Sequence, residues 1–206
     1  MTEEGSRVPL YSWFAPKQDA TTGAVLVGEA AALIGYESDA PWGRDSEGRP
    51  LTLDQFVTQY CDIVEIGGQS QAVPRPAPNN GAVAGTRVRY SEVNAFIRDF
   101  GNLGISIVGP LSGEVAGLGG GSFTARSLPP RAANAVELYV AIMTPDSTLP
   151  AGWTIEVAQT APFYGGTGGA YQLVFFDEFG APVRFTDPRL AASGVITFER
   201  YEEQQA

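Results

Sequence analysis

The spacing of apolar and polar residues along the chain predicts more strand than helix. Short runs alternate at the period of two that is typical of half-buried strands, and glycine, proline and asparagine separate these runs. We expect strands within residues 86–90, 105–108, 136–142, 153–158, 171–176 and 194–201. In the run 136–142 the apolar parity starts at Val136 and ends at Ile142, and we expect that side of the strand to be buried.

Two segments have helical character. Residues 53, 56, 57 and 60 are apolar at the spacing i, i+3, i+4 and i+7, and Thr52 stands where a helix N-cap is expected. Residues 23–35 suit a shorter helix with a glycine C-cap at Gly35. A strand over 24–27 followed by a turn is the alternative for this second segment, and in either form we expect it to be core.

Length and composition favour an α+β fold. The chain has 206 residues, of which 44% are hydrophobic, and this suits one sizeable domain or a domain with an N-terminal extension. Its 25 glycines and 15 prolines argue against a helical bundle. We expect residues 1–73 to form a partly helical extension packed on a β-rich domain at 74–206. Aromatic residues of the extension, Tyr11, Trp13 and Phe14, are expected to pack on that domain.

The charge balance narrows the class of partner. A net charge of −10 argues against nucleic acid, whose phosphate backbone needs a basic face. An anionic small molecule stays possible if a few arginines gather in one place. Of the 13 basic residues only Lys17 is a lysine, and the planar guanidinium of arginine binds phosphate in a bidentate manner.

Several chemistries are excluded by residues that the sequence lacks. It has no histidine, so serine–histidine catalysis, cysteine–histidine catalysis and histidine-ligated metals are ruled out. The single cysteine, Cys61, cannot form an internal disulfide or a cysteine-rich zinc site, and we expect it to be an inert, half-buried thiol. We therefore expect no metal and no cofactor. Any catalysis would use carboxylates, arginines, tyrosines, amides or the backbone.

Glycine-rich stretches border two of the expected strands. Residues 112–122 lack the lysine and the following helix of a phosphate-binding loop, and they indicate a flexible surface loop. The bend at 165–169 holds four glycines, which permit positive φ or a close approach of backbone to a ligand. It leads directly to Gln172, a polar amide at the start of an apolar strand.

These features follow one another in the order of a known family. The segment 126–130 is Arg-Ser-Leu-Pro-Pro, and after it come a strand, the adjacent aromatics Phe163 and Tyr164, the glycine bend and Gln172. This order resembles the NAD-hydrolysing toxin domains typified by tuberculosis necrotizing toxin and the fungal surface NADases. The resemblance covers roughly residues 75–176, about half of the chain.

The resemblance implies β-rich mixed sheets and hydrolysis of the bond between nicotinamide and ribose in NAD or NADP. Arg126, taken as a strand-end residue before a rigid turn, would hold the pyrophosphate. Gln172 would be the catalytic amide that aligns the ribose or the attacking water. The further residues implied to contact the substrate are Arg98, Phe163, Tyr164, Gly168 and Gly169.

The chain departs from the family pattern in two places. The family has aspartate before its substrate-site arginine, whereas this chain has Arg98 before Asp99. In a strand that swap would turn Arg98 to the opposite face unless a bulge restores it. A histidine that the family often places near the substrate is also missing, and Tyr139 could replace it sterically. An inactive binding or structural domain and an ADP-ribosyltransferase therefore remain alternatives.

The resemblance also bears on partners and location. An active enzyme would drain NAD from its own cell, so we expect export, delivery to a target cell or an immunity protein. Residues 1–6 lack the positive region and apolar core of a classical signal peptide. No run reaches the roughly 18 to 20 apolar residues of a membrane span, and none is expected.

Overall fold

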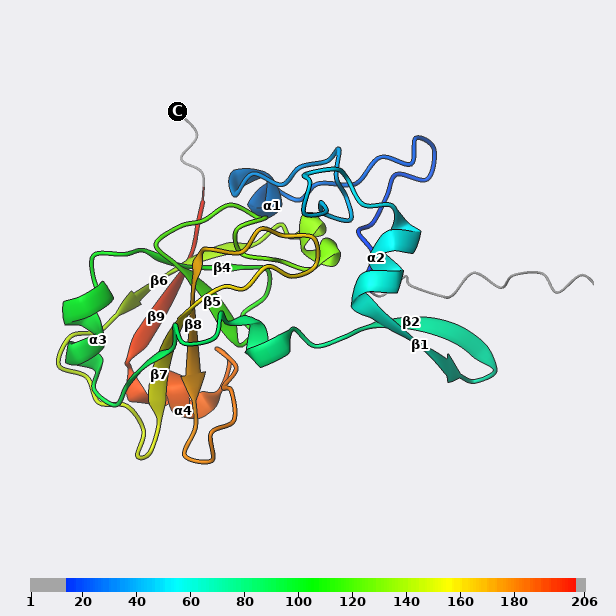
Figure 1. Cartoon of the computed structure of the whole chain (residues 1–206). Helices are drawn as coiled ribbons and strands as arrows, with labels where there is room; N and C mark the ends of the chain where they lie inside the picture. Colours follow the sequence, from blue (N-terminus) through cyan, green and yellow to red (C-terminus); the bar gives the residue numbers. More distant parts are fainter. Residues whose placement is uncertain (1–13, 203–206) are drawn as a thin grey trace, which may run out of the picture.

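The computed structural model describes residues 14–202 and shows a chain built mainly of antiparallel strands (Figure 1). Tyr11 and Trp13 lie outside the described residues. A two-stranded sheet contains β1 (Cys61–Ile66) and β2 (Gln69–Pro74). A seven-stranded sheet has the order β3 (Val88–Tyr90), β7 (Thr154–Gln159), β8 (Tyr171–Phe176), β5 (Val115–Leu118), β4 (Ile105–Val108), β6 (Leu138–Met143) and β9 (Ile196–Arg200).

The helices are few and short. They are α1 (Glu29–Leu33), α2 (Leu53–Tyr60), α3 (Val93–Phe100) and α4 (Pro188–Ser193), with 3-10 turns η1 (Pro78–Gly81) and η2 (Pro130–Asn134). No described helix is long and apolar enough to cross a membrane. The expected α+β class, rich in strand, is confirmed.

The expected helix at 52–61 is present as α2. Thr52 accepts a hydrogen bond from the backbone N–H of Gln55, whose side chain accepts one from the N–H of Thr52, so the pair forms a capping box. The expected helix at 23–35 is shortened to α1, and Gly35 follows it at a φ of 73°. The prediction that this segment is core was wrong for its large residues. Only its small residues, including Ala30 and Ala31, are buried, while Leu26, Val27 and Leu33 are exposed.

The expected strands are all present, with one correction of parity. In β6 the buried residues are Ala141 and Met143, whereas Val136 and Ile142 are exposed, so the predicted buried side was wrong. The opposite side of β6 faces the core because the register of the sheet pairs Ala141 with Ile105 of β4. A run whose two sides are both apolar does not reveal by itself which side is buried.

Two segments fold differently from the prediction. Residues 112–122 are more than a surface loop, because they contain β5, which pairs with both β4 and β8 and buries Ala116 and Leu118. The region before Gly101 is the helix α3, with Val93 and Phe96 buried, so the strand argument for Arg98 does not apply. The β1–β2 hairpin and α4 were not predicted.

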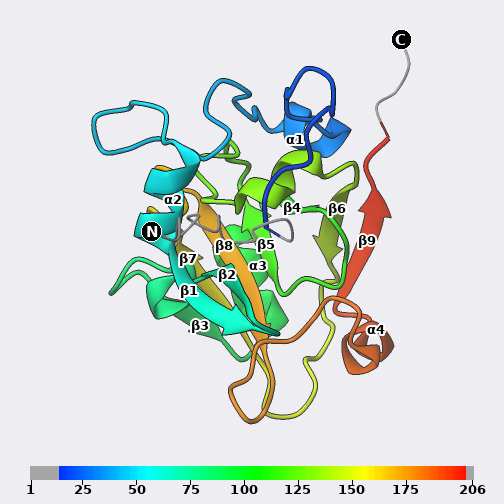
Figure 2. The ribbon, with the colours of Figure 1, turned by 90° about the vertical axis from the view of Figure 1, so that its right-hand side faces the viewer.

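The seven-stranded sheet has a different covering on each face. On one face α3 and α4 bury Phe96 and Leu190 against Leu173 and other apolar residues of the sheet. The opposite face carries Gln172 and Glu156 and lies toward α2 and the hairpin (Figures 1 and 2). The two faces differ because successive residues of a strand alternate in direction.

A second apolar cluster joins the N-terminal part of the chain to the glycine bend. Phe14, Trp42 and Phe56 are buried in it, and Phe163 and Tyr164 of the bend pack against its edge. This arrangement is consistent with an extension packed on the domain. The division into 1–73 and 74–206 stays a prediction.

Two glycines allow the backbones of the extension and the bend to touch. A Cβ on Gly43 would lie 2.6 Å from the Cα of Gly165, and the N–H of Arg44 donates to the carbonyl of Gly165 at 2.9 Å. Gly43 also has a φ of 78°. No other residue type fits between these two backbones without moving one of them.

We expect Gly43→Ala to lower the free energy of unfolding more than Gly48→Ala. Both glycines have a φ near 80°, but a Cβ on Gly48 would meet nothing within 4 Å. Gly48→Ala should cost about 1–2 kcal/mol for the left-handed backbone. Gly43→Ala should cost about 1–3 kcal/mol more through overpacking. Denaturant unfolding of both variants measures the difference, and equal losses would show that the contact carries no energy.

Candidate functional site

Three strands bring small and polar residues together in one row on the sheet face opposite α3. Gly117 of β5 stands opposite Gln172 of β8 on one side and opposite Ser106 of β4 on the other. Residues directly opposite one another on neighbouring strands point to the same face. Gln172 and Ser106 therefore flank a position at which the sheet has no side chain.

The side chain of Arg126 fills the space above Gly117. A Cβ on Gly117 would lie 2.6 Å from the guanidinium carbon of Arg126. The guanidinium donates to Ser106 Oγ at 2.7 Å through Nη2 and to the carbonyl of Gly121 at 3.0 Å through Nε. Gly117 thus makes room for an arginine beside Gln172.

No carboxylate of the described residues pairs with Arg126. Its hydrogen-bond partners are a hydroxyl and a carbonyl, and burial lowers the pKa of its guanidinium. Arginine stays protonated even so, because its guanidinium is a far stronger base than the other side chains of proteins. A half-buried positive charge without a counter-ion favours an anionic ligand such as a phosphate group.

We expected Arg126 at the end of a strand, but it lies in a turn. Residues 123–127 form consecutive turns, the N–H of Arg126 donates to the carbonyl of Ser122, and Ser127 has a φ of 48°. The position of the guanidinium therefore depends on what holds this turn.

The glycine bend holds it. Ser127 Oγ donates to the carbonyl of Ala161 at 2.8 Å and accepts from the N–H of Phe163 at 3.2 Å. The N–H of Gly168 also donates to the carbonyl of Thr124. The two turns that carry the family resemblance thus lie against each other, and together they set the distance between Arg126 and the strand of Gln172.

Gln172 has a fixed amide. The residue is 7% exposed, and Nε2 donates to the backbone carbonyl of Asn80 at 3.2 Å. Because a carbonyl can only accept, Nε2 must face Asn80 and Oε1 is left as an acceptor. Gln172 can therefore accept a hydrogen bond from a water molecule or a ligand hydroxyl.

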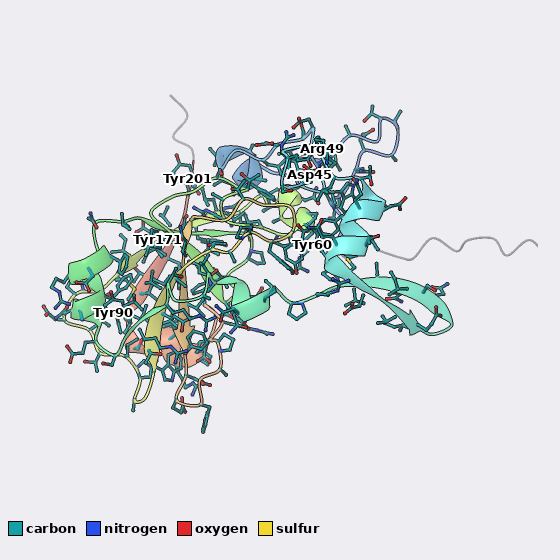
Figure 3. The ribbon with its side chains drawn as sticks, in the orientation of Figure 1. Asp45, Arg49, Tyr60, Tyr90, Tyr171 and Tyr201 are labelled. Carbon is teal, nitrogen blue, oxygen red and sulfur yellow. The ribbon has the colours of Figure 1, made fainter. Side chains whose placement is uncertain are left out.

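Phe163 and Tyr164 lie at the junction between the bend and the extension. Phe163 contacts the ring of Tyr60, which Figure 3 labels beside α2, at 5.1 Å between centroids. Tyr164 stacks on Phe56 and donates to the carbonyl of Arg75 at 3.0 Å. These rings anchor the bend, and their role toward a ligand stays a prediction.

The two glycines proposed for ligand approach differ in surroundings. Gly168 is buried, and a Cβ there would lie 2.6 Å from the backbone of Pro162. Gly169 is exposed, with nothing within 4 Å of the same position. Gly168 thus serves the packing of the bend, and Gly169 leaves open space beside it.

Arg98 is not brought to the row of Arg126 and Gln172. It lies on α3, which covers the other face of the sheet, and it pairs with Asp99 at 2.9 Å while 72% of its side chain is exposed. Asp99 also accepts a hydrogen bond from Tyr90, and Phe100 contacts Tyr171; Figure 3 labels both tyrosines on this side.

Sequence reasoning missed a charged cluster on the face of Gln172. Glu156 of β7 is only 3% exposed and pairs with Arg89 at 2.7 Å and with Arg87 at 3.4 Å. The alternation Arg87-Val88-Arg89 could have predicted this cluster. It places both arginines on one side of a strand, and a neighbouring strand is then expected to carry an acidic partner.

Comparison with known proteins confirms the resemblance. No family model matches the chain. The Outer membrane channel protein CpnT of Mycobacterium tuberculosis (strain ATCC 25618 / H37Rv) and that of Mycobacterium bovis (strain BCG / Pasteur 1173P2) are each 32% identical to it over 155 residues. The match covers 74% of this chain and 18% of each relative, so the chain spans less than a fifth of their length.

A solved structure agrees with these relatives. The chain matches tuberculosis necrotizing toxin, solved in complex with its immunity factor, with a TM-score of 0.66 and 27% sequence identity over 83% of both chains. The fold predicted from the resemblance is therefore confirmed, while the individual site residues stay predictions.

We expect Gly117→Ala to displace Arg126 and weaken binding of inorganic pyrophosphate by about tenfold or more, because one charge-assisted hydrogen bond contributes about 1.5–3 kcal/mol. Gly104→Ala is the matched control, since its Cβ would meet nothing within 4 Å and neither glycine has a positive φ. Titration calorimetry of both variants and of the parent protein tests this. Equal affinities in all three would separate Arg126 from anion binding.

Cys61 should be unreactive in the folded protein. Burial raises the pKa of its thiol to about 11 from an ordinary 9.0. At pH 8 the thiolate fraction should then be about 100-fold lower than in the unfolded chain, because each pKa unit is a factor of ten. Alkylation by iodoacetamide with and without denaturant measures this, and similar rates in both would contradict it.

Proposed function

From its likeness in sequence and fold to tuberculosis necrotizing toxin, we propose that this chain is an NAD(P) glycohydrolase. The observation that carries the proposal is the guanidinium of Arg126, held beside Gln172 without a carboxylate partner among the described residues. A dinucleotide brings a pyrophosphate that matches such a charge. It also brings a ribose whose reacting carbon needs an oriented water.

The reaction needs neither a strong general acid nor a histidine. Water attacks the anomeric carbon of the nicotinamide ribose, the bond from that carbon to the pyridinium nitrogen breaks, and its electron pair neutralises the ring. The products are nicotinamide, ADP-ribose and one proton. The ribose passes through a state like an oxocarbenium ion, as in glycoside hydrolysis.

Each residue of the row has a defined part in this proposal. Arg126 binds the pyrophosphate and so fixes the dinucleotide across the sheet face. Gln172 accepts a hydrogen bond through Oε1 from the attacking water or from a ribose hydroxyl, since its Nε2 is already bonded to Asn80. Phe163 and Tyr164 and the open backbone at Gly169 border the same bend. Arg98 has no part in the proposed site.

Two alternative functions use the same site differently. An ADP-ribosyltransferase would break the same bond and pass ADP-ribose to a protein, but such enzymes usually carry a glutamate where this chain has Gln172. An inactive domain would bind the dinucleotide without turnover. The transferase is disfavoured because Gln172 has no carboxylate. The site is also built for an amide, since the carbonyl of Asn80 accepts from Nε2 and would repel a carboxylate at this position.

Delivery and inhibition form part of the proposal. The structural neighbour was solved with an immunity factor, and we propose that an inhibitor protein likewise protects the cell that makes this chain. The curated relatives are outer membrane channel proteins, and the chain matches only a small part of them. Export or transfer to a target cell is therefore the proposed location of its activity.

We expect the purified protein to release nicotinamide from NAD. Gln172→Ala should lower kcat by about 10²–10³-fold, the effect of removing one hydrogen-bonding group aimed at a transition state. Arg126→Ala should lower kcat/KM by about 30-fold or more, because loss of a buried charge from a charge pair costs about 2 kcal/mol or more. Chromatographic assay of nicotinamide and ADP-ribose measures both.

Arg49→Ala is the matched control, because Arg49 is exposed and its ion pairs within residues 14–202 are with acidic residues of its own turn. Its activity should equal that of the parent protein. Nicotinamide release with ADP-ribose found on protein instead of free would indicate the transferase. Binding of NAD without release of nicotinamide would indicate the inactive domain and overturn the proposal.

A further inference from the structure

The buried carboxylate of Glu156 is linked to Gln172 through Arg87 and the turn at Asn79 and Asn80. Glu156 is the one charged residue that is buried among the described residues, and it lies on β7 opposite Val174 of β8. Its carboxylate takes Arg89 at 2.7 Å and lies 3.4 Å from Nε of Arg87. That Nε is buried and makes no hydrogen bond among the described residues. The position of the Arg87 guanidinium therefore does not depend on a hydrogen bond to Glu156.

The other end of the Arg87 guanidinium reaches the loop over Gln172. Its Nη2 donates to the backbone carbonyl of Asn79. The same carbonyl accepts the N–H of Ala82, and the side chain of Asn79 donates to the carbonyl of Ala82. Arg87 therefore grips a tight, self-bonded turn.

That turn is strained and needs to be held. Asn79 and Asn80 have φ values of 52° and 49°, the left-handed region, which asparagine adopts more readily than most residues with a Cβ but which still favours glycine. Two consecutive residues of this kind persist only where surrounding contacts fix them. The residue that follows the turn, Gly81, is also fixed, because its carbonyl accepts a hydrogen bond from the N–H of Ala161 at 2.8 Å.

The turn in its left-handed form places the carbonyl of Asn80 against Gln172 Nε2, at 3.2 Å. We infer that Glu156 and Arg87 are positioning residues, which hold the Asn79–Asn80 turn so that the Gln172 amide presents Oε1 to the substrate. This inference rests on the proposed function for its catalytic consequence. The positioning itself concerns the protein alone.

Arg87 differs from Arg126 in the partners of its guanidinium. Arg87 lies next to a buried carboxylate, whereas Arg126 has none among the described residues. Glu156 is shared with Arg89, but Nη2 of Arg87 is already bonded to the carbonyl of Asn79, so Arg87 has less to offer an anionic ligand than Arg126. Arg87 should therefore act on the rate of the chemical step and leave substrate affinity nearly unchanged.

The first experiment observes Gln172 directly. In a ¹H–¹⁵N spectrum of the full chain, the side-chain NH₂ signals of Gln172 are assigned by their loss in Gln172→Ala. We expect Arg87→Met to move these signals toward the position of a free amide and to speed their exchange with water. Arg184→Met is the control, since Arg184 is exposed and pairs with Glu114 at 3.8 Å on the surface.

The second experiment measures nicotinamide release. Arg87→Met should lower kcat by on the order of 10- to 100-fold with KM within about twofold, as a misplaced group costs rate and not affinity. Glu156→Gln should give a smaller loss of the same kind, and Arg87→Lys should restore part of kcat. Arg184→Met should match the parent protein in both constants.

The two readouts separate the possible failures. Unchanged Gln172 signals in Arg87→Met would overturn the inference. A raised KM with an unchanged kcat would make Arg87 a substrate-binding residue and would also overturn it. Shifted Gln172 signals in a protein that releases no nicotinamide, parent included, would support the positioning and defeat the proposed function alone.

Discussion

A positive charge pressed against a glycine is the constraint on which the candidate site depends. The guanidinium of Arg126 occupies the space between Gln172 and Ser106, and Gly117 must lack a side chain for that space to exist. The charge finds a hydroxyl and a carbonyl but no described carboxylate. A positive charge in such a place favours an anionic ligand.

The surrounding structure keeps this space in place. The turn of Arg126 and the glycine bend share Ser127 as a common hydrogen-bonding residue, and the bend is anchored in turn by Phe163 and Tyr164 on the N-terminal cluster. On the other side of Gln172 the Asn79–Asn80 turn performs the matching task. Residues far apart in sequence are thus brought together by hydrogen bonds to one another's backbone.

Much of this could be predicted from the sequence where one local rule decides the outcome. The spacing of Phe56 and Tyr60 behind Thr52 was enough to find α2, and the segments around Arg126 and Gln172 were recognised by their order. Val93, Phe96 and Phe100 have a similar helical spacing, yet a strand was assumed there. Arg98 was assigned to the site by the resemblance, and the helix places it elsewhere. β5 was not predicted because it contains a glycine, a residue that weakens strands. Gly117 is required by its contact with Arg126, which the local sequence does not reveal.

The joining of the two motif turns also bears on how the sequence can diverge. Thr124, Ser127 and Gly168 make hydrogen bonds between the two turns that a single inserted residue would break, so lengths at this end of the sheet are held constant by geometry. The connections at 144–153 and 177–182 leave the opposite ends of the same strands (Figure 1) and carry no such contact with the site. These two connections can therefore lengthen in related sequences. Insertions should accumulate at that end of the sheet, while the turns around Arg126 and Gln172 keep their lengths.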